Sequence, residues 1–416
     1  MRRTGVARRA FVLGAAGLVA AMTSAGDAVA SPVGRRGGGG RPGAAPGQVR
    51  GMWVATVANI DWPSEPGLTA ARQEAELFAY LDRAVELRLN AVVFQVRPTA
   101  DALWPSPHEP WAACLTGTQG KDPGWDPLGT AVRAAHDRSL ELHAWFNPYR
   151  VANHTDPTRL IASHPARQHP GWVVPYGGKL YYNPGLPEVR RFVQDAMLDA
   201  VRRYDIDAVH WDDYFYPYPV AGQTFDDDAE FERYGGGFAD RAAWRRDNID
   251  RLVRETAERI RQIKPHVRFG ISPFAVWRNA ATDPLGSDTR AGVETYDDLY
   301  ADTRKWVKEG WIDYICPQVY WLAQPLDQQV PANYRVLVPW WADVVRGTGV
   351  DLYIGEALYK VGDPAQPQGW QDPRELSRHL DICATYPEVR GNIYFSATQV
   401  ASDRLGAMAI IAERYK

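Results

Sequence analysis

Two adjacent carboxyl groups stand out in this sequence, within His210-Trp211-Asp212-Asp213-Tyr214. They directly follow an apolar run, so a single strand end would hold both of them. Hydrolysis of a glycosidic bond usually needs two carboxyl groups, one that protonates the leaving oxygen and one that acts as nucleophile or activates water. Asp212 is therefore the first candidate catalytic residue. Asp213 joins it in the candidate catalytic set, with a structural or supporting role as the alternative.

Three other acidic residues are candidates for the partner carboxyl group of Asp212. Glu356, at the end of a later apolar run, has the best position among them. Asp101 and Glu294, which follow other apolar runs, are the alternatives. Position along the chain is the only argument for Glu356. A structural cap of the following loop is the alternative reading of Asp212 itself.

Basic, amide and aromatic residues at several run ends could bind a sugar polymer. Arg97 and Arg150 could bind a substrate carboxylate or orient Asp212. The candidate substrate-binding residues are Arg97, Asp101, Asn147, Arg150, His210, Tyr214, Trp277, Gln318, Tyr320 and Trp321. Aromatic rings stack on the apolar faces of sugars, but for each of these rings packing in the core is an equally weighted alternative.

Other chemistries have weaker signals in this sequence. It contains no H-E-x-x-H, G-x-S-x-G or P-loop motif, and no G-x-G-x-x-G follows a strand-like run. His143 and His210 could bind a metal with Asp212, which leaves a metal-dependent deacetylase or amidase as an alternative function. We expect no metal and no cofactor. We expect the acidic segment 226–228 to be a solvated loop and Cys316 to be a buried strand residue.

The elements that must position these residues alternate regularly from Val49 onward. The predicted strands are 49–56, 90–97, 140–147, 207–212, 267–272, 312–319, 350–356 and 391–397. The predicted helices are 69–88, 126–138, 187–204, 241–263, 297–309, 328–346, 372–385 and 402–414. Eight alternations without an interrupting linker predict an α/β fold, a single (β/α)8 barrel over residues 48–416 with long loops at its C-terminal face. Two separate α/β domains are the alternative.

The alternation of side chains along a strand predicts which residues face the barrel interior. Ala208, His210 and Asp212 share one parity, and Val209, Trp211 and Asp213 share the other. Because the Val/Trp face suits the helix layer, we expect Asp212 to point into the barrel mouth. The same argument points these residues inward: Gln95, Arg97, His143, Asn147 and Gln318.

Residues 1–30 are predicted to be an export signal. Arg8 and Arg9 precede an apolar stretch, and Ala28-Val29-Ala30 is a cleavage signal. The paired arginines predict the twin-arginine route, with an ordinary secretion signal as the alternative. Residues 31–47 are predicted to be a flexible Gly/Pro/Arg linker. The protein is thus expected to be secreted or extracytoplasmic, without stable insertion in a membrane.

The charge of the chain limits its partners. The whole chain carries −3, but residues 1–47 hold seven arginines and one aspartate, so the body from Gln48 carries −9. Such a charge argues against a nucleic-acid partner. The three cysteines exclude a disulfide-stapled scaffold. We expect a polysaccharide as the partner and a monomer as the oligomeric state.

Six motifs at successive strand ends occur in a recognisable order. They are Gly51-Met52-Trp53-Val54-Ala55-Thr56 with Asp61-Trp62-Pro63, Gln95-Val96-Arg97-Pro98 with Asp101-Ala102, His143 to Arg150, His210 to Pro217, Ser272-Pro273-Phe274 with Trp277-Arg278-Asn279, and Pro317 to Trp321. Asn183-Pro184-Gly185 with Pro187-Glu188-Val189-Arg190 continues the match between the third and the fourth. In this order they resemble the glycosyl-hydrolase-like 10 family.

The resemblance implies a glycosidase-type (β/α)8 barrel, an exported or envelope location and activity on bacterial cell-wall glycan. Some family members cut peptidoglycan strands that lack stem peptides. These strands carry a lactyl carboxylate on alternate sugars, which a body at −9 repels. Local arginines such as Arg97, Arg150 and Arg278 would therefore have to bind it. A glycan-binding barrel without catalytic activity is the alternative of a different class.

Overall fold

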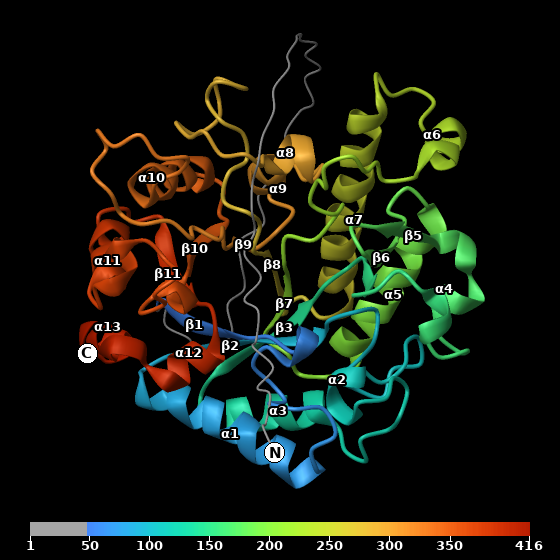
Figure 1. Ribbon diagram of the computed structural model, residues 1–416, viewed down its shortest axis with the longest axis horizontal. Helices are drawn as coiled ribbons and strands as arrows, with labels where there is room; N and C mark the ends of the chain where they lie inside the picture. The colour runs from blue at the N-terminus through green and yellow to red at the C-terminus, as the bar shows by residue number, and fades with distance from the viewer. Residues whose placement is uncertain (1–47) are drawn as a thin grey trace, which may run out of the picture.

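The computed structural model describes residues 48–416, so the predicted export signal and linker lie outside the described residues. Eight parallel strands close into a barrel in the order β1-β11-β10-β9-β8-β7-β3-β2, which confirms the predicted (β/α)8 architecture (Figure 1). These strands are β1 (Val49–Val54), β2 (Ala91–Arg97), β3 (Glu141–Phe146), β7 (Ala208–Trp211), β8 (Arg268–Ile271), β9 (Tyr314–Ile315), β10 (Asp351–Glu356) and β11 (Val389–Tyr394).

Helices surround the ring of strands on its outside (Figure 1). The main ones are α1 (Ala70–Glu86), α3 (Pro127–His136), α5 (Pro187–Arg203), α7 (Arg241–Ile263), α9 (Thr303–Lys308), α10 (Tyr334–Val345), α11 (Glu375–Ala384), α12 (Ala397–Ser402) and α13 (Ala407–Arg414). In the part of the chain that the structure describes, no helix is long and apolar enough to cross a bilayer.

Three predicted elements are shorter or interrupted in the structure. The predicted helix 297–309 is two short helices, α8 (Thr295–Asp298) and α9, because Tyr300 adopts a positive φ of 53° between them. Left-handed residues between α12 and α13 likewise divide the predicted helix 402–414. Of the predicted strand 312–319 only β9 pairs continuously, although Gln318 forms single bridges to Phe274, which follows β8, and to Gly355 of β10.

The strands separate two apolar cores because their side chains alternate. Trp53, Trp145 and Tyr314 belong to a small cluster inside the barrel. Val209 and Trp211 belong to the large cluster between strands and helices. The predicted parity of β7 is therefore confirmed. Cys316 lies in the inner cluster and is fully buried, as predicted.

The long segment after β3 contains a small antiparallel sheet that the sequence analysis did not predict. Its order is β4-β6-β5, formed by β4 (Arg150–Ala152), β5 (Val173–Tyr176) and β6 (Lys179–Tyr182). Gly177 and Gly178 join β5 to β6 with φ values of 57° and 77°, which a two-residue hairpin with this twist requires. The small sheet holds Arg150 and Lys179 in fixed positions.

The acidic segment 226–228 differs from the prediction of a solvated loop. Asp227 is fully buried, and its carboxylate pairs with the guanidinium of Arg245. Asp226 and Asp228 remain exposed. The middle carboxylate therefore anchors the loop to α7, because a buried charge needs a paired partner.

Candidate active site

Asp212 directly follows the C-terminal end of β7, and its carboxyl group accepts hydrogen bonds from three N–H donors. Asn147 Nδ2 lies 3.0 Å from Oδ1 and 3.1 Å from Oδ2, and Trp145 Nε1 lies 3.1 Å from Oδ2. The Tyr214 backbone N–H is 3.4 Å from Oδ1. Only 4% of Asp212 is exposed. This geometry fixes the orientation of the carboxyl group at the barrel mouth.

Asp213 is buried beside Asp212, and its side-chain partners come from the segments that follow β7 and β9. Tyr218 donates its hydroxyl hydrogen to Oδ2, and Gln318 is a further hydrogen-bond partner. Burial raises the pKa of Asp212 to about 6; Arg150 opposes this rise, and the Asp213 charge adds to it. Burial likewise raises the pKa of Asp213. Two adjacent buried carboxyl groups do not readily ionise together, so the pair can keep one proton up to about pH 6.

Arg97 supports the site from behind rather than contacting a substrate. It is fully buried, and Nε and Nη2 form a bidentate ion pair with Glu109. Nη1 donates to the carbonyl oxygens of Asn147 and, at 3.1 Å, Pro148. The expectation that Arg97 binds substrate is therefore corrected, because all its nitrogens are engaged away from solvent. It positions the loop that carries Asn147.

Arg150 and Lys179 place two positive charges over the ring of Tyr214. The guanidinium carbon of Arg150 lies 4.9 Å from the ring centroid, and Lys179 Nζ lies 6.0 Å from it. Arg150 donates to the Pro98 carbonyl oxygen at 3.1–3.2 Å. Within residues 48–416, neither cation forms an ion pair with an acidic side chain. This corner of the mouth is thus positive, next to Asp212.

Glu356 is not the partner carboxyl group of Asp212. It accepts hydrogen bonds from Tyr334 Oη at 2.7 Å, His379 Nδ1 at 2.7 Å and Asn392 Nδ2 at 2.8 Å. These partners come from α10, α11 and β11, so the carboxylate faces the helix layer. Tyr353, of the opposite parity on β10, faces the barrel interior. The positional prediction is wrong because Glu356 lies on the outer face of its strand.

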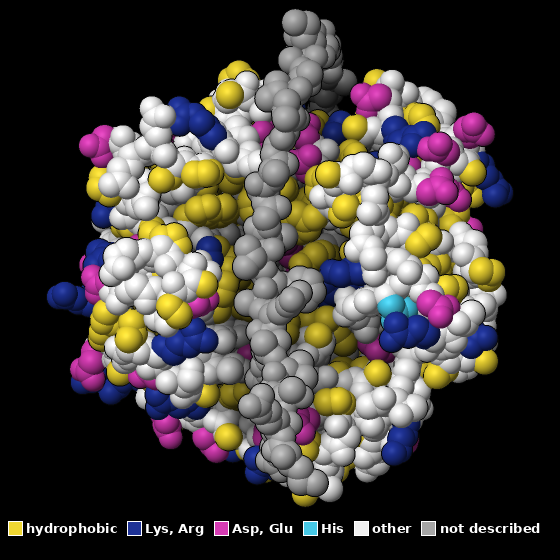
Figure 2. Space-filling model, viewed as in Figure 1, with side chains coloured by type: hydrophobic (Ala, Val, Ile, Leu, Met, Phe, Trp, Pro, Cys, Tyr) yellow, Lys and Arg dark blue, Asp and Glu magenta, His cyan; other side chains and the backbone are white. Residues whose placement is uncertain are grey.

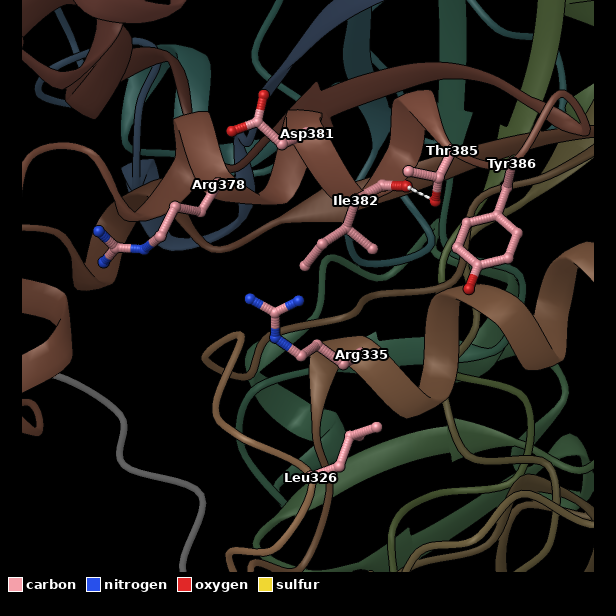
Figure 3. Close-up of a pocket in the computed structure, with 7 residues that line it drawn as sticks. All are labelled: Leu326, Arg335, Arg378, Asp381, Ile382, Thr385 and Tyr386. Carbon is pink, nitrogen blue, oxygen red and sulfur yellow. Dashed lines mark hydrogen bonds between the residues drawn. The ribbon is translucent and has the colours of Figure 1, made fainter.

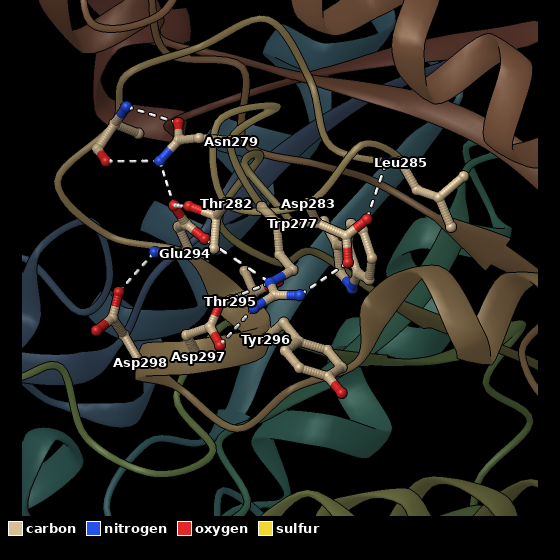
Figure 4. A network of polar contacts seen from close by, with 12 residues as sticks. Trp277, Asn279, Thr282, Asp283, Leu285, Glu294, Thr295, Tyr296, Asp297 and Asp298 are labelled. Atoms are coloured by element: carbon tan, nitrogen blue, oxygen red, sulfur yellow. Dashed lines mark hydrogen bonds and ion pairs between the residues drawn. The ribbon is translucent and has the colours of Figure 1, made fainter. Parts of the chain in front are cut away.

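The other two acidic candidates are also committed to their own loops. Asp101 is buried and accepts from the backbone N–H and hydroxyl of Thr99, both at 3.1 Å. Glu294 accepts from Asn279 and from Thr282 in a polar network of the segment after β8 (Figure 4). Within residues 48–416, the carboxyl group that acts electrostatically on Asp212 is Asp213. Asp101 is thus a structural residue of its turn, not a substrate contact.

The same network holds Arg278, which was expected to bind a substrate carboxylate. Its guanidinium pairs with Asp283 at 2.8 Å and with Asp297 at 2.7 Å (Figure 4). Trp277 is 5% exposed and donates from Nε1 to Asp302 at 2.9 Å. Packing, rather than sugar binding, therefore describes Trp277, and loop anchoring describes Arg278.

His210 and His143 lie in the barrel interior below the carboxyl pair. Both Nδ1 atoms contact the Tyr314 hydroxyl, at 2.9 Å for His210 and 3.1 Å for His143. His210 Nε2 accepts from Trp53 Nε1 at 3.2 Å, and burial lowers its pKa well below the usual value. His210 is therefore a neutral core residue rather than a substrate contact. Within the described residues, no three metal-ligating side chains gather.

Gln318, Tyr320 and Trp321 are half-buried at the end of β9, on the Asp213 side of the mouth. Trp321 packs edge-on against Phe274 at 5.5 Å, and Tyr320 packs against Tyr359 at 5.8 Å. On the face shown in Figure 2, apolar side chains are visible on both sides of the grey atoms, and many charged ones lie around the edge. These aromatic rings remain candidates for sugar contacts.

A separate pocket of about 350 Å³ opens on the outer layer between α10 and α11 (Figure 3). Its lining residues are Leu326, Arg335, Arg378, Asp381, Ile382, Thr385 and Tyr386. Arg378 is paired with Asp372 and Glu375. The pocket contains none of the candidate catalytic residues, so we do not assign the reaction to it.

Sequence reasoning missed four residues of the site: Trp145, Glu109, Tyr218 and Lys179. Trp145 shares its parity with His143 and Asn147, so strand alternation could have found it. Glu109, Tyr218 and Lys179 lie in loops or in the small sheet. Their proximity to the site arises from tertiary contacts, and spacing along the chain carries no signal for it.

The chain is similar in sequence to two glycosyl hydrolases. Glycosyl hydrolase YngK of Bacillus subtilis (strain 168) is 50% identical over 361 residues, covering 86% of this chain and 70% of that protein. Glycosyl hydrolase DigH of Escherichia coli (strain K12) is 42% identical over 367 residues, covering 83% and 82%.

A solved structure and a family model extend the comparison. The glycoside hydrolase domain of PgaB (BpsB) from Bordetella bronchiseptica shares the fold, with a TM-score of 0.55, 14% identity and coverage of 88% of this chain and 98% of that one. The family model described as glycosyl hydrolase-like 10 matches residues 48–372. With these relatives, a closed (β/α)8 barrel and a buried carboxyl pair at its mouth, this chain belongs to the glycosyl hydrolase-like 10 family and is a glycoside hydrolase.

Proposed function

We propose that this enzyme cleaves glycosidic bonds in the peptide-free glycan strands of bacterial peptidoglycan, with Asp212 and Asp213 as its acid–base pair. The observation that carries the proposal is that these two adjacent carboxyl groups are both buried at the mouth and act on each other. A pair that keeps one proton can protonate the leaving oxygen, while the remaining carboxylate stabilises positive charge on the sugar or activates water.

The support for a charged cell-wall glycan comes from the cations beside the pair. Arg150 acts on Asp212, and Lys179 lies beside Arg150 at the Tyr214 ring; neither forms an ion pair with an acidic side chain in the described chain. A lactyl carboxylate on alternate sugars offers the charge that this corner lacks. We further propose that the enzyme acts outside the cytoplasm, since residues 1–30 have the pattern of an export signal.

The test is incubation of the enzyme with peptide-free glycan strands, with products identified by mass spectrometry. New reducing ends support hydrolysis, loss of acetyl mass supports the deacetylase alternative, and retention without change supports a binding barrel. Asp212→Asn should lower kcat by about 10²–10⁴-fold, as expected for loss of a general acid or base. Asp226→Asn, in an exposed position, is the matched control and should keep wild-type kcat. Wild-type kcat in Asp212→Asn would overturn the catalytic assignment.

A further inference from the structure

Lys179 carries a positive charge that the described part of the protein does not balance. Within residues 48–416, its Nζ forms neither an ion pair nor a hydrogen bond with another side chain. Lys305, by contrast, is exposed and places Nζ 2.7 Å from Asp250 Oδ2. Lys179 is half-buried, and its contact is the face of the Tyr214 ring at 6.0 Å. An ammonium group in this setting has lost part of its hydration without gaining a counter-ion.

The small sheet holds Lys179 in this position. Lys179 begins β6 and pairs with Tyr176 across the Gly177–Gly178 turn. On its other side β6 pairs with β4, which begins at Arg150. Both cations therefore come from neighbouring strands of one sheet. Both cations lie over the Tyr214 ring. The backbone N–H of Tyr214 lies 3.4 Å from Asp212 Oδ1.

The local charges show which cation is in surplus. Arg150 acts on both carboxyl groups of the pair, whereas neither carboxyl group is among the charges that act on Lys179. Burial and the Arg150 charge lower the pKa of Lys179, so the neighbourhood disfavours this second cation when no ligand is bound. Other buried arginines, such as Arg97 and Arg245, are paired with carboxylates. An anionic ligand would supply the charge that is lacking at Lys179.

We propose that Lys179 is a specificity-determining residue that, together with Arg150, binds the carboxylate of an acidic sugar beside the scissile bond. The inference rests on the proposed function and adds to it the residue that distinguishes a carboxylated glycan from a neutral one. A sugar carboxylate carries one negative charge and accepts hydrogen bonds from both cations.

The experiment compares peptide-free peptidoglycan strands with the same strands after their lactyl carboxylates are converted to amides. Both kcat and KM are measured for the wild type, Lys179→Met and Lys179→Arg. Lys308→Met, on the exposed side of α9, removes the same charge at a distance and is the matched control. Thermal unfolding of each variant establishes that it is folded.

Lys179→Met should lower the preference for carboxylated over amidated strands, as a ratio of kcat/KM, by about tenfold, mostly through KM, since a hydrogen bond to a charged group is lost. Lys179→Arg should keep most of the preference, and Lys308→Met all of it. Equal losses on both substrates, or no change in the ratio, would overturn the inference. A wild type that cleaves both substrates equally well would also overturn it and leave hydrolysis standing. Cleavage of neither would overturn the proposed function itself, and the inference with it.

Discussion

Asp212 and Asp213 derive their chemistry from burial and from each other. Asn147 and Trp145 donate N–H groups to the Asp212 carboxylate, whereas Asp213 has a hydroxyl partner in Tyr218. Donors stabilise the ionised form, and burial destabilises it. The balance leaves the pair with a proton to exchange near pH 6, and glycosidic bond cleavage requires such a proton.

The pH dependence of the reaction follows from this balance at the residue scale. Burial raises the pKa of Asp212 to about 6, so the pair loses its shared proton as the pH rises through that value. We expect kcat/KM to fall above about pH 6, because no carboxylic acid is then left to protonate the leaving oxygen. A pH profile of kcat/KM checks this. A rate that keeps rising up to pH 8 would contradict an acid role for the pair.

Glu356 stabilises the fold, and a single substitution can distinguish this role from a role in catalysis. Burial opposes the charge of His379, but Glu356 and Glu375 raise its pKa, so the buried contact is an ion pair. Glu356→Gln should lower the free energy of unfolding by about 3 kcal/mol, the cost of leaving a buried charge without its partner. Chemical denaturation measures this loss, and kcat of the folded variant should stay near the wild-type value.

The control for Glu356→Gln is Glu413→Gln. Glu413 has a side chain that is 67% exposed and pairs with Lys416 at the surface. Surface pairs contribute little, so the stability should change by less than about 0.5 kcal/mol. A loss of kcat by Glu356→Gln as large as that of Asp212→Asn would restore Glu356 as a catalytic candidate.

At the scale of elements, β3 and β7 carry the carboxyl group and its donors, and the loops behind them hold both strands in place. Arg97, at the end of β2, links Glu109 to the carbonyl oxygens at the end of β3. The register of three neighbouring strands therefore determines the orientation of Asp212. Inside the barrel, the packing of the Tyr314 ring requires β8 and β9 to approach each other closely at Gly270.

Gly270 on β8 is the position where this approach can be tested. A Cβ atom there would lie 2.1 Å from the ring of Tyr314, whose hydroxyl is held between His143 and His210. Gly270→Ala should lower the free energy of unfolding by about 1–3 kcal/mol or more, because the ring has no free space to enter. Thermal or chemical unfolding measures the loss. Gly236→Ala, with no atom within 4 Å of the new Cβ, is the control, and equal stability of both variants would refute the packing argument.

At the scale of the whole molecule, the N-terminal segment and the body of the chain differ in charge. Residues 1–47 are strongly basic, and the body carries −9. A negative body repels an anionic glycan at long range, so binding must depend on local cations and on ionic strength. The positive corner at Arg150 and Lys179 is where the described structure offers such cations.

The proposed export route can be tested on the full chain. The double substitution Arg8→Lys and Arg9→Lys should abolish transport of the folded protein if the paired arginines are the recognition signal of the twin-arginine route. Cell fractionation followed by immunoblotting measures the exported share. Unchanged export of this double variant would favour the ordinary secretion signal instead.

The sequence by itself determined the barrel and the direction of Asp212. Eight apolar runs alternating with helical segments suffice for the architecture, and the period of two along β7 suffices to point Asp212 inward. Both are local properties of the chain, so they can be predicted without tertiary contacts. The polar strand ends likewise pointed to the C-terminal face of the barrel, but strand parity grouped Asp213 with Val209 and Trp211, and only the structure places it beside Asp212.

The tertiary structure alone decided which polar residues meet. Both faces of β10 are buried, so apolar alternation carried no signal that Glu356 faces His379 rather than the mouth. Arg97 met Glu109 through a loop, and Lys179 came beside Tyr214 through the small sheet. Hydrogen bonds and ion pairs depend on distances between atoms far apart in the chain, and those distances exist only once the strands and loops have packed.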